Sequence, residues 1–500
     1  MQNVRDDNPH TPKPSLFMAV LPIALTMALL MIQLFIFDDF TPHVPLALGI
    51  MITGVIGWKL GYRWSHMETG LYHVVSVGLP SLAILMTVGM IIGVWILSGT
   101  VPLLIYYGLA ILSPGTFLVA ACLVCAVISL ATGTSWGTVG TVGLALMGIG
   151  EGLGVPAYLT GGAVVSGSFF GDKMSPLSDT TNLAPAVCGN DLWSHIRGMV
   201  PTTLPAMLVA LAIYGLVGMR YAGGAMHTEN VELLSNKLEE TFYLSWWLLI
   251  PPAVVVVLAL KRLPALPSIF AGVVLGGIVA VVAQGVSLHD VFNAMQKGYI
   301  SDTGIAAVDT LLTKGGIQSM TWVITLVLIA LGFGGMLEQT RCLEVVLENV
   351  LKVAKGRFGL IAASTGASIG TNVVTGDVYL SIALPGRMFA PAYRGRGLST
   401  TNLSRSVEDG GTLMSPLIPW NVGGAFVSGT LGIPTLVYAP VAFACWLSPL
   451  FGLLWAATGW FVPKASEAEK QRWRDLDEAI MVEVETGVNG DAVHANRVPI

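Results

Sequence analysis

Charged residues are scarce in this sequence of 500 residues. Asp, Glu, Lys and Arg together make up 11% of the chain, against about 25% in ordinary soluble domains. Hydrophobic residues make up 54%, and the mean hydropathy is +0.72. So few charges cannot cover a water-exposed surface, which excludes a soluble enzyme, a nucleic-acid-binding protein and a secreted disulfide scaffold. The composition predicts an all-α polytopic membrane protein whose main partner is lipid.

Motifs for disulfides, metals and nucleotides are also missing. The five cysteines include one closely spaced pair, Cys122 and Cys125, but both lie in an apolar run that is typical of a buried helix. The eight histidines show no metal-ligand spacing, and no phosphate-binding loop is present. The sequence therefore predicts no resident cofactor and no ATP-driven step, and it favours a secondary transporter over an enzyme.

What the sequence does contain is a series of apolar runs. A bilayer core of about 30 Å is crossed by about 20 apolar residues in a helix. Simple runs of this kind lie at 15–37, 43–58, 79–98, 199–219, 243–260, 266–284, 317–337 and 434–461. Two further regions, 117–190 and 358–430, are apolar but interrupted by polar and charged residues. Together the runs predict about ten spanning helices plus two re-entrant hairpins, with one hairpin and one discontinuous transmembrane helix in each interrupted region.

Short motifs in the interrupted regions recur in the same order, which indicates an internal duplication. The tetrapeptide Met-Ser-Pro-Leu at Met174 recurs at Met414, 240 residues later (414 − 174). A Gly-Thr pair at Gly133 recurs at Gly370, 237 residues later (370 − 133). Two repeats are therefore expected, at 79–219 and 317–461.

The basic residues predict how these repeats are oriented, because cytoplasmic loops are enriched in Lys and Arg. The segment 98–115 has no Lys or Arg, whereas its counterpart 338–357 has four. The bias reverses in the pair 188–198 and 428–434, where only the first segment contains a basic residue. Equivalent loops thus face opposite sides of the membrane. The repeats are expected to be inverted, with both chain termini in the cytoplasm.

These expectations divide the chain into six parts. They are a cytoplasmic N-terminus (1–14), leading transmembrane helices (15–78), inverted repeat one (79–219), a linker with two transmembrane helices (220–316), inverted repeat two (317–461) and a cytoplasmic tail (462–500). The tail is charged, and we identify no chemistry in it.

The interruptions are the predicted functional site. Non-helical backbone survives within a membrane only inside protein or beside water, and broken helices at the interface of inverted repeats usually hold substrate and coupling ions. Pro176 and Pro416 lack an amide hydrogen, so each forces a break within a Met-Ser-Pro-Leu motif. The hairpin tips are expected near Thr134 and Thr371, where glycine, hydroxyl and amide groups gather.

The first interruption carries three charges, Asp172, Lys173 and Asp179, although charges within a bilayer are costly. Neighbouring hydroxyl and amide oxygens suit a small, hard cation such as Na⁺. The candidate ion-binding residues of this repeat are Asp172, Ser175, Asp179, Thr180, Asn182, Gly133, Thr134 and Ser135. The Na⁺ ion itself is expected at Asp179, Thr180, Asn182, Thr134 and Ser135. For Asp172 and Lys173 the alternative is an ion pair that only fixes the helix break.

The second interruption is similar in form but different in chemistry. Glu408 and Asp409 precede its motif, whereas Asp179 has no acidic counterpart, because Pro419 stands 240 residues later (419 − 179). Asp377 is either a further ion-binding acid, a helix cap or a partner of Arg387. The candidate residues of this repeat are Thr371, Asn372, Asp377, Glu408, Asp409, Ser415 and Asn421. The candidate charge partners of the acids are Lys173 and Arg405.

Two segments carry a family resemblance, GTSWGT at 133–138 and FGDKMSPLSDTTNLAP at 170–185. They resemble the signature segments of NhaC-type sodium/proton antiporters, which belong to a broad ion transporter superfamily. The resemblance extends over roughly 15–461. It implies a multi-pass protein of a bacterial inner membrane that exchanges Na⁺, or Li⁺, for H⁺ by alternating access. It also implies inverted repeats with hairpins and interrupted helices.

Related proteins are similar to malate/lactate exchangers, so the alternative is a Na⁺- and H⁺-coupled exchanger of organic anions or amino acids. A carboxylate substrate would need a base at the site, and Arg405 and Lys173 could serve. A membrane-embedded enzyme or a channel is less favoured, because no nucleophile and base stand together and a pore does not need paired repeats. The expected transported partner is a small inorganic cation, or a small organic anion, and a homodimer is left open.

Overall fold

The computed structural model describes residues 13–37, 41–221, 226–261, 263–471 and 473–474. Within these ranges the regular elements are helices, and one isolated antiparallel bridge joins Leu398 to Lys464. Six of the helices are long and apolar enough to cross a membrane, or up to eight if each of two bent pairs forms one span. An all-α polytopic membrane protein is therefore confirmed.

The helices of the first half follow one another with short connections. In chain order they are α1 (Leu16–Phe35), α2 (His43–Lys59), α3 (Trp64–Leu97), α4 (Thr100–Ile111), α5 (Pro114–Thr132), α6 (Ser135–Thr138), a π-helical turn (Val139–Gly143), α7 (Leu144–Gly152), α8 (Ala157–Met174), α9 (Asp179–Cys188) and α10 (Leu192–Met219). A connecting part then contains α11 (Met226–Thr241), a 3₁₀ turn (Trp246–Leu249), α12 (Ile250–Leu260), α13 (Ala265–Gln284), α14 (Leu288–Lys297) and α15 (Ala306–Leu312).

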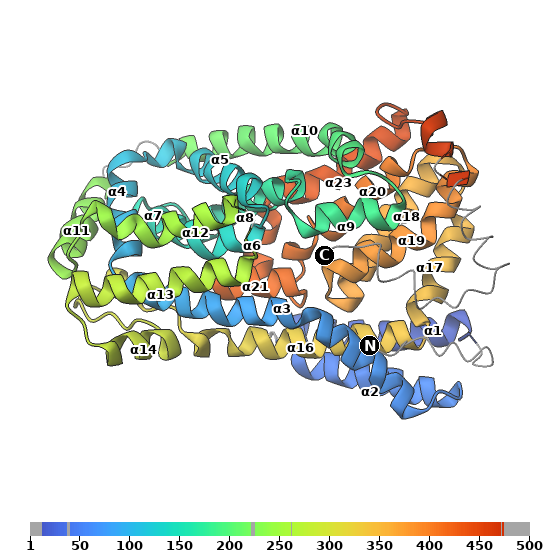
Figure 1. Cartoon of the computed structure of the whole chain (residues 1–500), viewed down its shortest axis with the longest axis horizontal. Coiled ribbons are helices and arrows are strands. Elements are labelled where there is room, and N and C mark those ends of the chain that lie inside the picture. Colours follow the sequence, from blue (N-terminus) through green and yellow to red (C-terminus); the bar gives the residue numbers. More distant parts are fainter. Residues whose placement is uncertain (1–12, 38–40, 222–225, 262, 472, 475–500) are drawn as a thin grey trace.

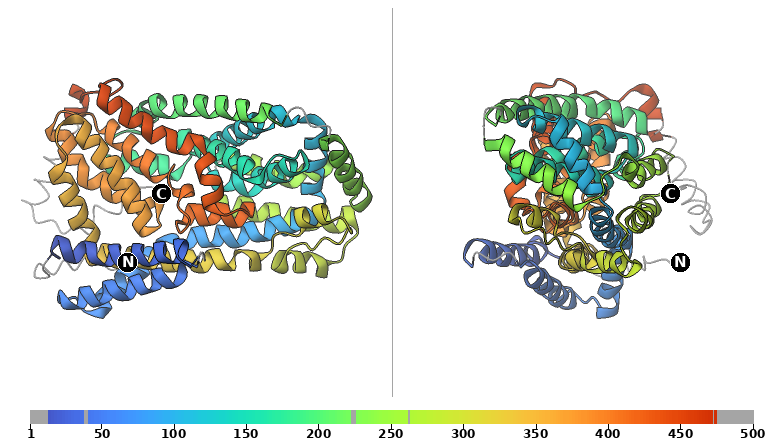
Figure 2. Two further views of the ribbon diagram at one scale, coloured as in Figure 1. Left: turned by 180° about the vertical axis from the view of Figure 1, so that it is seen from behind. Right: turned by 90° about the vertical axis from the view of Figure 1, so that its left-hand side faces the viewer.

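The second half begins with a long helix and also contains interrupted segments. Its elements are α16 (Ile317–Gln339), α17 (Cys342–Val353), α18 (Gly356–Thr375), α19 (Val378–Gly395), α20 (Thr400–Gly411), a 3₁₀ turn (Ser415–Leu417), α21 (Val422–Leu431), α22 (Thr435–Tyr438), a 3₁₀ turn (Ala439–Val441) and α23 (Phe443–Thr458). Figure 1 shows that α3, α10, α13 and α16 lie along the longest axis of the molecule. The two further views in Figure 2 show the same bundle from behind and from one end.

Small residues bring the helices of the first half close together. A Cβ atom on Gly167 of α8 would lie 2.1 Å from the carbonyl oxygen of Cys122 in α5, and one on Gly171 would lie 2.4 Å from that of Ala126. Only glycine permits this approach. Cys122 and Cys125 are fully buried in α5. The contact fixes the position of the half-helix α8, which ends at the first chain break.

Three expected boundaries differ from the structure. Helix α3 runs without interruption from Trp64 to Leu97, so the expected boundary between residues 78 and 79 lies inside a helix. The chain bends by 92° between Thr400–Leu431 and Thr435–Val441, at the start of the expected single span 434–461. That span is itself broken further on, at the 3₁₀ turn Ala439–Val441. Pro440 explains the break, because proline has no amide hydrogen to continue the helix. The expected span 243–260 starts with a 3₁₀ turn before α12, after a bend of 94° from α11.

Candidate ion-binding site

The first chain break lies where the sequence predicts it, between α8 and α9. Helix α8 ends at Met174 and α9 begins at Asp179, with Pro176 between them. The amide nitrogen of Asn182 donates to the carbonyl oxygens of Pro176 (2.9 Å) and Ser178 (2.6 Å). These bonds satisfy backbone groups that the break leaves without helical partners. Asn182 therefore closes the break by binding its backbone.

The second chain break is closed by two asparagines. Asn372 donates from its amide nitrogen to the carbonyl oxygens of Gly410 (3.1 Å) and Gly411 (2.7 Å) at the end of α20. Asn421 donates in turn to Oδ1 of Asn372 (2.6 Å), and its own Oδ1 accepts from the backbone of Gly423 (2.9 Å). Both asparagines are fully buried. Their polar atoms are therefore engaged in holding the chain at the second break.

The two expected hairpin tips have different outcomes. Gly133 adopts a left-handed conformation (φ 71°) between α5 and α6, as a tip near Thr134 requires. A tip near Thr371 is wrong, because α18 continues through this residue to Thr375 and the left-handed residue is Gly376 (φ 66°). The recurring Gly-Thr pair at Gly370 misled the prediction, since that glycine is helical.

The residues that follow the two left-handed glycines act alike. Thr134 accepts a hydrogen bond from the backbone of Gly137 (3.2 Å), and Asp377 accepts one from that of Leu380 (2.7 Å). Each side chain thus caps the N-terminus of the next helix. Of the roles open to Asp377, the structure shows the cap. The guanidinium of Arg387 donates to the carbonyl of Ala383 (3.4 Å).

A cavity of about 350 Å³ lies between the two halves of the chain. It collects many of the predicted residues from both halves, namely Gly133, Thr134, Ser135, Asp172, Asp179, Thr180, Asp377 and Ser415, together with Tyr379 and Thr412. The remaining predicted residues are outside its lining: Ser175, Asn182, Thr371, Asn372, Glu408, Asp409, Asn421, Lys173 and Arg405. Carboxylate and hydroxyl oxygens therefore dominate the polar part of the wall.

The two aspartates of the first break differ in their surroundings. Asp172 is 6% exposed, and its Oδ2 accepts a hydrogen bond from Ser135 (2.6 Å). Its Oδ1 has no hydrogen-bond partner within the described part of the chain. Asp179 is exposed, and its carboxylate accepts from the backbone of Thr180 (2.8 Å) and from the hydroxyl of Tyr379 (2.5 Å). The hydroxyl of Tyr379 comes from the other half of the chain.

Helix dipoles act on the two aspartates in opposite directions. Asp172 lies in the last turn of α8, and Asp179 is the first residue of α9. The N-terminus of a helix favours a negative charge and the C-terminus disfavours one, by about 0.3–1 kcal/mol each. Asp179 thus lies at a helix end that suits an anionic group, and Asp172 lies at a helix end that does not.

A buried ion pair joins the two halves behind the cavity. The Nζ atom of Lys173 in α8 contacts Oδ1 of Asp409 in α20, and the two side chains are 0% and 2% exposed. Ser448 of α23 donates to the same carboxylate oxygen, and Lys173 donates to Ser448 (3.2 Å). Lys173 is therefore paired with Asp409, one of the acids that it was expected to balance, and the alternative of an ion pair with Asp172 is wrong. No sequence signal pointed to Ser448, which lies far along the chain.

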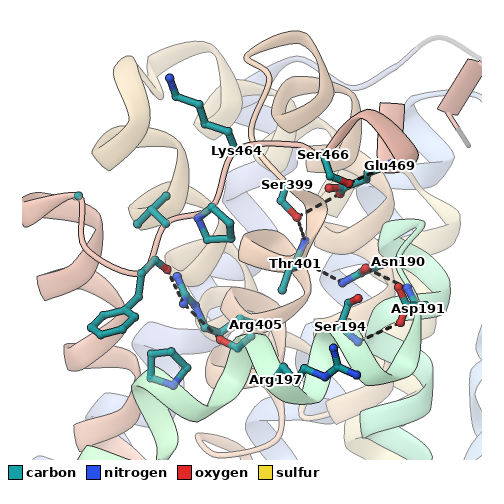
Figure 3. A pocket seen from close by; sticks show the side chains of 16 residues that line it. Asn190, Asp191, Ser194, Arg197, Ser399, Thr401, Arg405, Lys464, Ser466 and Glu469 are labelled. Carbon is teal, nitrogen blue, oxygen red and sulfur yellow. Dashed lines mark hydrogen bonds between the residues drawn. The ribbon is translucent and has the colours of Figure 1, made fainter. Parts of the chain in front are cut away.

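Glu408 and Arg405 lie on the same half-helix, and within the described residues no ion pair joins them. Glu408 accepts from the hydroxyl of Thr412 (2.7 Å), and its second oxygen has no partner in the described structure. Arg405 donates to the carbonyl oxygens of Gly198 (3.3 Å) and Phe461 (3.0 Å). It lines a different cavity of about 650 Å³ (Figure 3). Arg405 thus forms no ion pair with the acids that it was expected to balance within the described residues, although Asp409 lies one turn further along the same helix.

Tyr379, like Thr412, is a polar cavity residue that the sequence did not predict. The two left-handed glycines, 243 residues apart (376 − 133), provide a signal that could have found it. Counted from these glycines, Tyr379 corresponds to Trp136 of the GTSWGT segment (379 − 136 = 243). The ring of Trp136 stacks on Phe426 of α21, with centroids 4.4 Å apart. Each of these two aromatic residues therefore reaches from its own half of the chain to the other half.

Residues 167–460 match the Na⁺/H⁺ antiporter family. The chain is 40% identical over 461 residues to the Na⁺/H⁺ antiporter NhaC of Alkalihalophilus pseudofirmus, covering 92% of this chain and 99% of that protein. It is 39% identical over 453 residues to the arginine/ornithine antiporter ArcD of Halobacterium salinarum (90% and 93%). It is 35% identical over 449 residues to the malate-2H⁺/Na⁺-lactate antiporter of Bacillus subtilis (90% and 96%).

Proposed function

Because the chain belongs to the Na⁺/H⁺ antiporter family, we propose that it is a secondary active transporter that exchanges Na⁺, or Li⁺, for H⁺. The observation that carries the proposal is the cavity between the halves, where Asp172 and Asp179 lie among hydroxyl groups. Oxygen ligands of this kind suit a small, hard cation. The protein spans the membrane several times; we place it in a bacterial inner membrane with both termini in the cytoplasm.

We infer that the ion and the proton use neighbouring carboxylates. The proposed Na⁺ ligands are Asp179, Thr180, Thr134 and Ser135, which all line the cavity. Asp172 is the proposed proton carrier, because it is buried, has one carboxylate oxygen without a partner in the described residues, and lies at a helix C-terminus. Ser135 contacts Asp172 and can therefore couple the two events.

The halves are proposed to be inverted repeats, each with a re-entrant hairpin and a discontinuous helix. Helix bounds support the duplication: α6 to α7 cover 135–152 and α19 covers 378–395, an offset of 243 at both ends (378 − 135, 395 − 152). The inversion is supported by α4 and α17, which are both 12 residues long and lie at opposite ends of the molecule in Figure 1. The proposed hairpins turn at Gly133 and Gly376.

The repeats are best taken as 64–219 and 317–461, because α3 begins at Trp64. Residues 220–316 form the proposed linker, with α12 and α13 as its transmembrane helices. The N-terminal 1–14 and the tail 462–500 are the proposed cytoplasmic ends. In this arrangement the cavity lies where the two interrupted segments meet, which is the usual place for ion sites in such transporters.

Exchange of an organic anion or amino acid remains the second candidate, because two relatives carry such names. A carboxylate substrate needs a free base beside it. Lys173 is engaged with Asp409, and Arg405 lines another cavity. The geometry of the cavity between the halves therefore supports cation exchange better than anion exchange.

The test is transport by purified protein in liposomes that contain a pH-sensitive dye. Na⁺ or Li⁺ alone should move protons, whereas a response that requires malate, lactate, arginine or ornithine would favour the second candidate.

Asp179→Asn should reduce exchange by at least tenfold with no loss of folded protein, since it removes the charged Na⁺ ligand. The matched control is Asp302→Asn, which alters an exposed aspartate in the loop after α14. Wild-type Na⁺ affinity in Asp179→Asn would contradict the proposed site.

A further inference from the structure

The chain after α23 returns across the N-terminal end of α20. Leu398 and Lys464 form an antiparallel bridge. The backbone of Ser399 donates to the carbonyl of Pro463 (3.2 Å), and that of Ala465 donates to the carbonyl of Gly397 (3.0 Å). The first residues of the tail are thus held by backbone hydrogen bonds against the loop that leads into α20.

One tail carboxylate occupies the start of α20. A single oxygen of Glu469, Oε1, accepts hydrogen bonds from the hydroxyl of Ser399 (3.1 Å), the backbone of Thr400 (2.7 Å) and the hydroxyl of Thr400 (2.9 Å). Glu469 is 9% exposed. Figure 3 shows Glu469 and Ser399 on the wall of the cavity of about 650 Å³ that Arg405 also lines. A carboxylate with several charge-assisted bonds at a helix N-terminus is a strong local contact.

Helix α20 connects this contact to the buried acids. All twelve residues of α20 are buried. Asp409 lies nine residues after Thr400, which is about 14 Å along a helix. At that end, Asp409 pairs with Lys173 of the first half, and Glu408 lies beside it. A short, fully packed helix transmits a displacement of its first turn to its last turn, because packed cores resist continuous deformation.

We propose that Glu469 is a positioning residue for transport, whose carboxylate anchors the first turn of α20 and so sets where Glu408 and Asp409 lie opposite Lys173. The inference rests on the proposed exchange function and adds a residue of the tail to it. Arg405 supports the same arrangement, because its guanidinium holds the carbonyl of Phe461 at the point where the chain leaves α23.

The experiment compares variants of the full chain in liposomes. Glu469→Ala should lower kcat for Na⁺/H⁺ exchange about five- to tenfold per folded transporter and shift the pH profile, since it removes a charge-assisted anchor. Glu469→Gln keeps an acceptor oxygen and should give an intermediate kcat. The matched control is Glu467→Ala, two residues earlier, where the carboxylate is exposed and pairs with Lys470. This control should retain the wild-type kcat, KM and pH profile.

A second measurement does not depend on transport. Trypsin should cleave the tail after Lys470 faster in Glu469→Ala than in Glu467→Ala, because the anchor is lost. Equal kcat, KM and pH profiles in these two variants would overturn the inference, as would a loss limited to the amount of folded protein. Absence of exchange in the wild type would instead overturn the proposed function, and the trypsin result would still report whether Glu469 holds the tail.

Discussion

At the break between α8 and α9, carboxylates face the cavity, whereas at the break between α20 and α21 they turn away from it. Asp172 and Asp179 line the cavity beside the first break. At the second break, Asp409 points to Lys173 and Glu408 accepts from Thr412. The same Met-Ser-Pro-Leu motif thus has acids on the wall of the proposed ion site in one half and acids held by protein partners in the other.

The difference follows from which residues surround each motif. At an offset of 240, Asp172 corresponds to Thr412 and Asp179 corresponds to Pro419 (172 + 240, 179 + 240). Thr412 still lines the cavity, so the second half contributes a neutral oxygen where the first contributes an acid. The acids beside the first motif therefore line the cavity, whereas the one acid that the second half adds to the described wall, Asp377, lies apart from the second motif. Placing cavity-lining acids beside only one of the two motifs limits the number of carboxylates that face one another in a low-dielectric interior, where they would repel.

Removing the ion pair shared by the two breaks should have the largest effect on stability. Lys173→Ala leaves Asp409 buried without its cation, which is expected to lower the free energy of unfolding by about 3–5 kcal/mol. The measurement is thermal or denaturant unfolding of the purified protein in detergent.

A double variant separates lost charge pairing from lost packing. Lys173→Met combined with Asp409→Leu removes both charges and keeps apolar volume, so it should recover most of the stability that Lys173→Ala loses. If Lys173→Ala alone unfolds like the wild type, the pair does not hold the halves together, and Asp409 would be free to act as a second ion-binding acid.

The asparagines at the two breaks should differ in a smaller but measurable way. Asn372→Ala leaves the buried carbonyl oxygens of Gly410 and Gly411 without donors, at a cost of about 1–3 kcal/mol. Asn182→Ala at the first break should cost less, because Asn182 is exposed and water can replace its amide. Unfolding of both variants checks the order. Equal losses would mean that the second break is no more dependent on side-chain closure than the first.

The sequence predicted the breaks because their cause is local. Pro176 and Pro416 interrupt helices through their own covalent structure, so the motif that contains them is visible without the fold. Asp172 and Asp179 were found for a related reason, since charges in an apolar segment are costly and stand out. The tip expected near Thr371 was misplaced because two similar glycines lie six residues apart, and only the structure shows that Gly376 has positive φ.

Contacts between residues that are far apart in the chain could not be predicted from the sequence. Lys173 and Asp409 are 236 residues apart; Lys173 was predicted to balance one of the acids, but nothing in either segment selects Asp409 among them. Glu469 illustrates the same limit, because a glutamate in a charged tail resembles its solvated neighbours until the chain is seen to return to α20. A pattern in one sequence indicates the free-energy cost of placing a residue in its own segment, whereas these contacts depend on how distant helices pack together.

Two tyrosines offer the smallest and sharpest test of the comparison. Tyr379 donates to the carboxylate of Asp179 at the first break (2.5 Å), and Tyr438 donates to the carbonyl of Pro416 at the second (2.6 Å). Tyr379→Phe removes a donor that competes with Na⁺ for Asp179, so the KM for Na⁺ should fall about three- to tenfold, the equivalent of one hydrogen bond. The measurement is the initial rate of exchange against Na⁺ concentration.

Tyr438→Phe makes the same chemical change at the other break and serves as the matched control. Its lost partner is a buried backbone carbonyl, so the variant should unfold more easily, by about 1 kcal/mol, with an unchanged KM. An increase in KM in Tyr379→Phe would show that the hydroxyl holds Asp179 in place for the ion rather than competing with it. A change in KM in Tyr438→Phe would mean that the second break also contacts the ion, and the contrast between the two breaks would then be wrong.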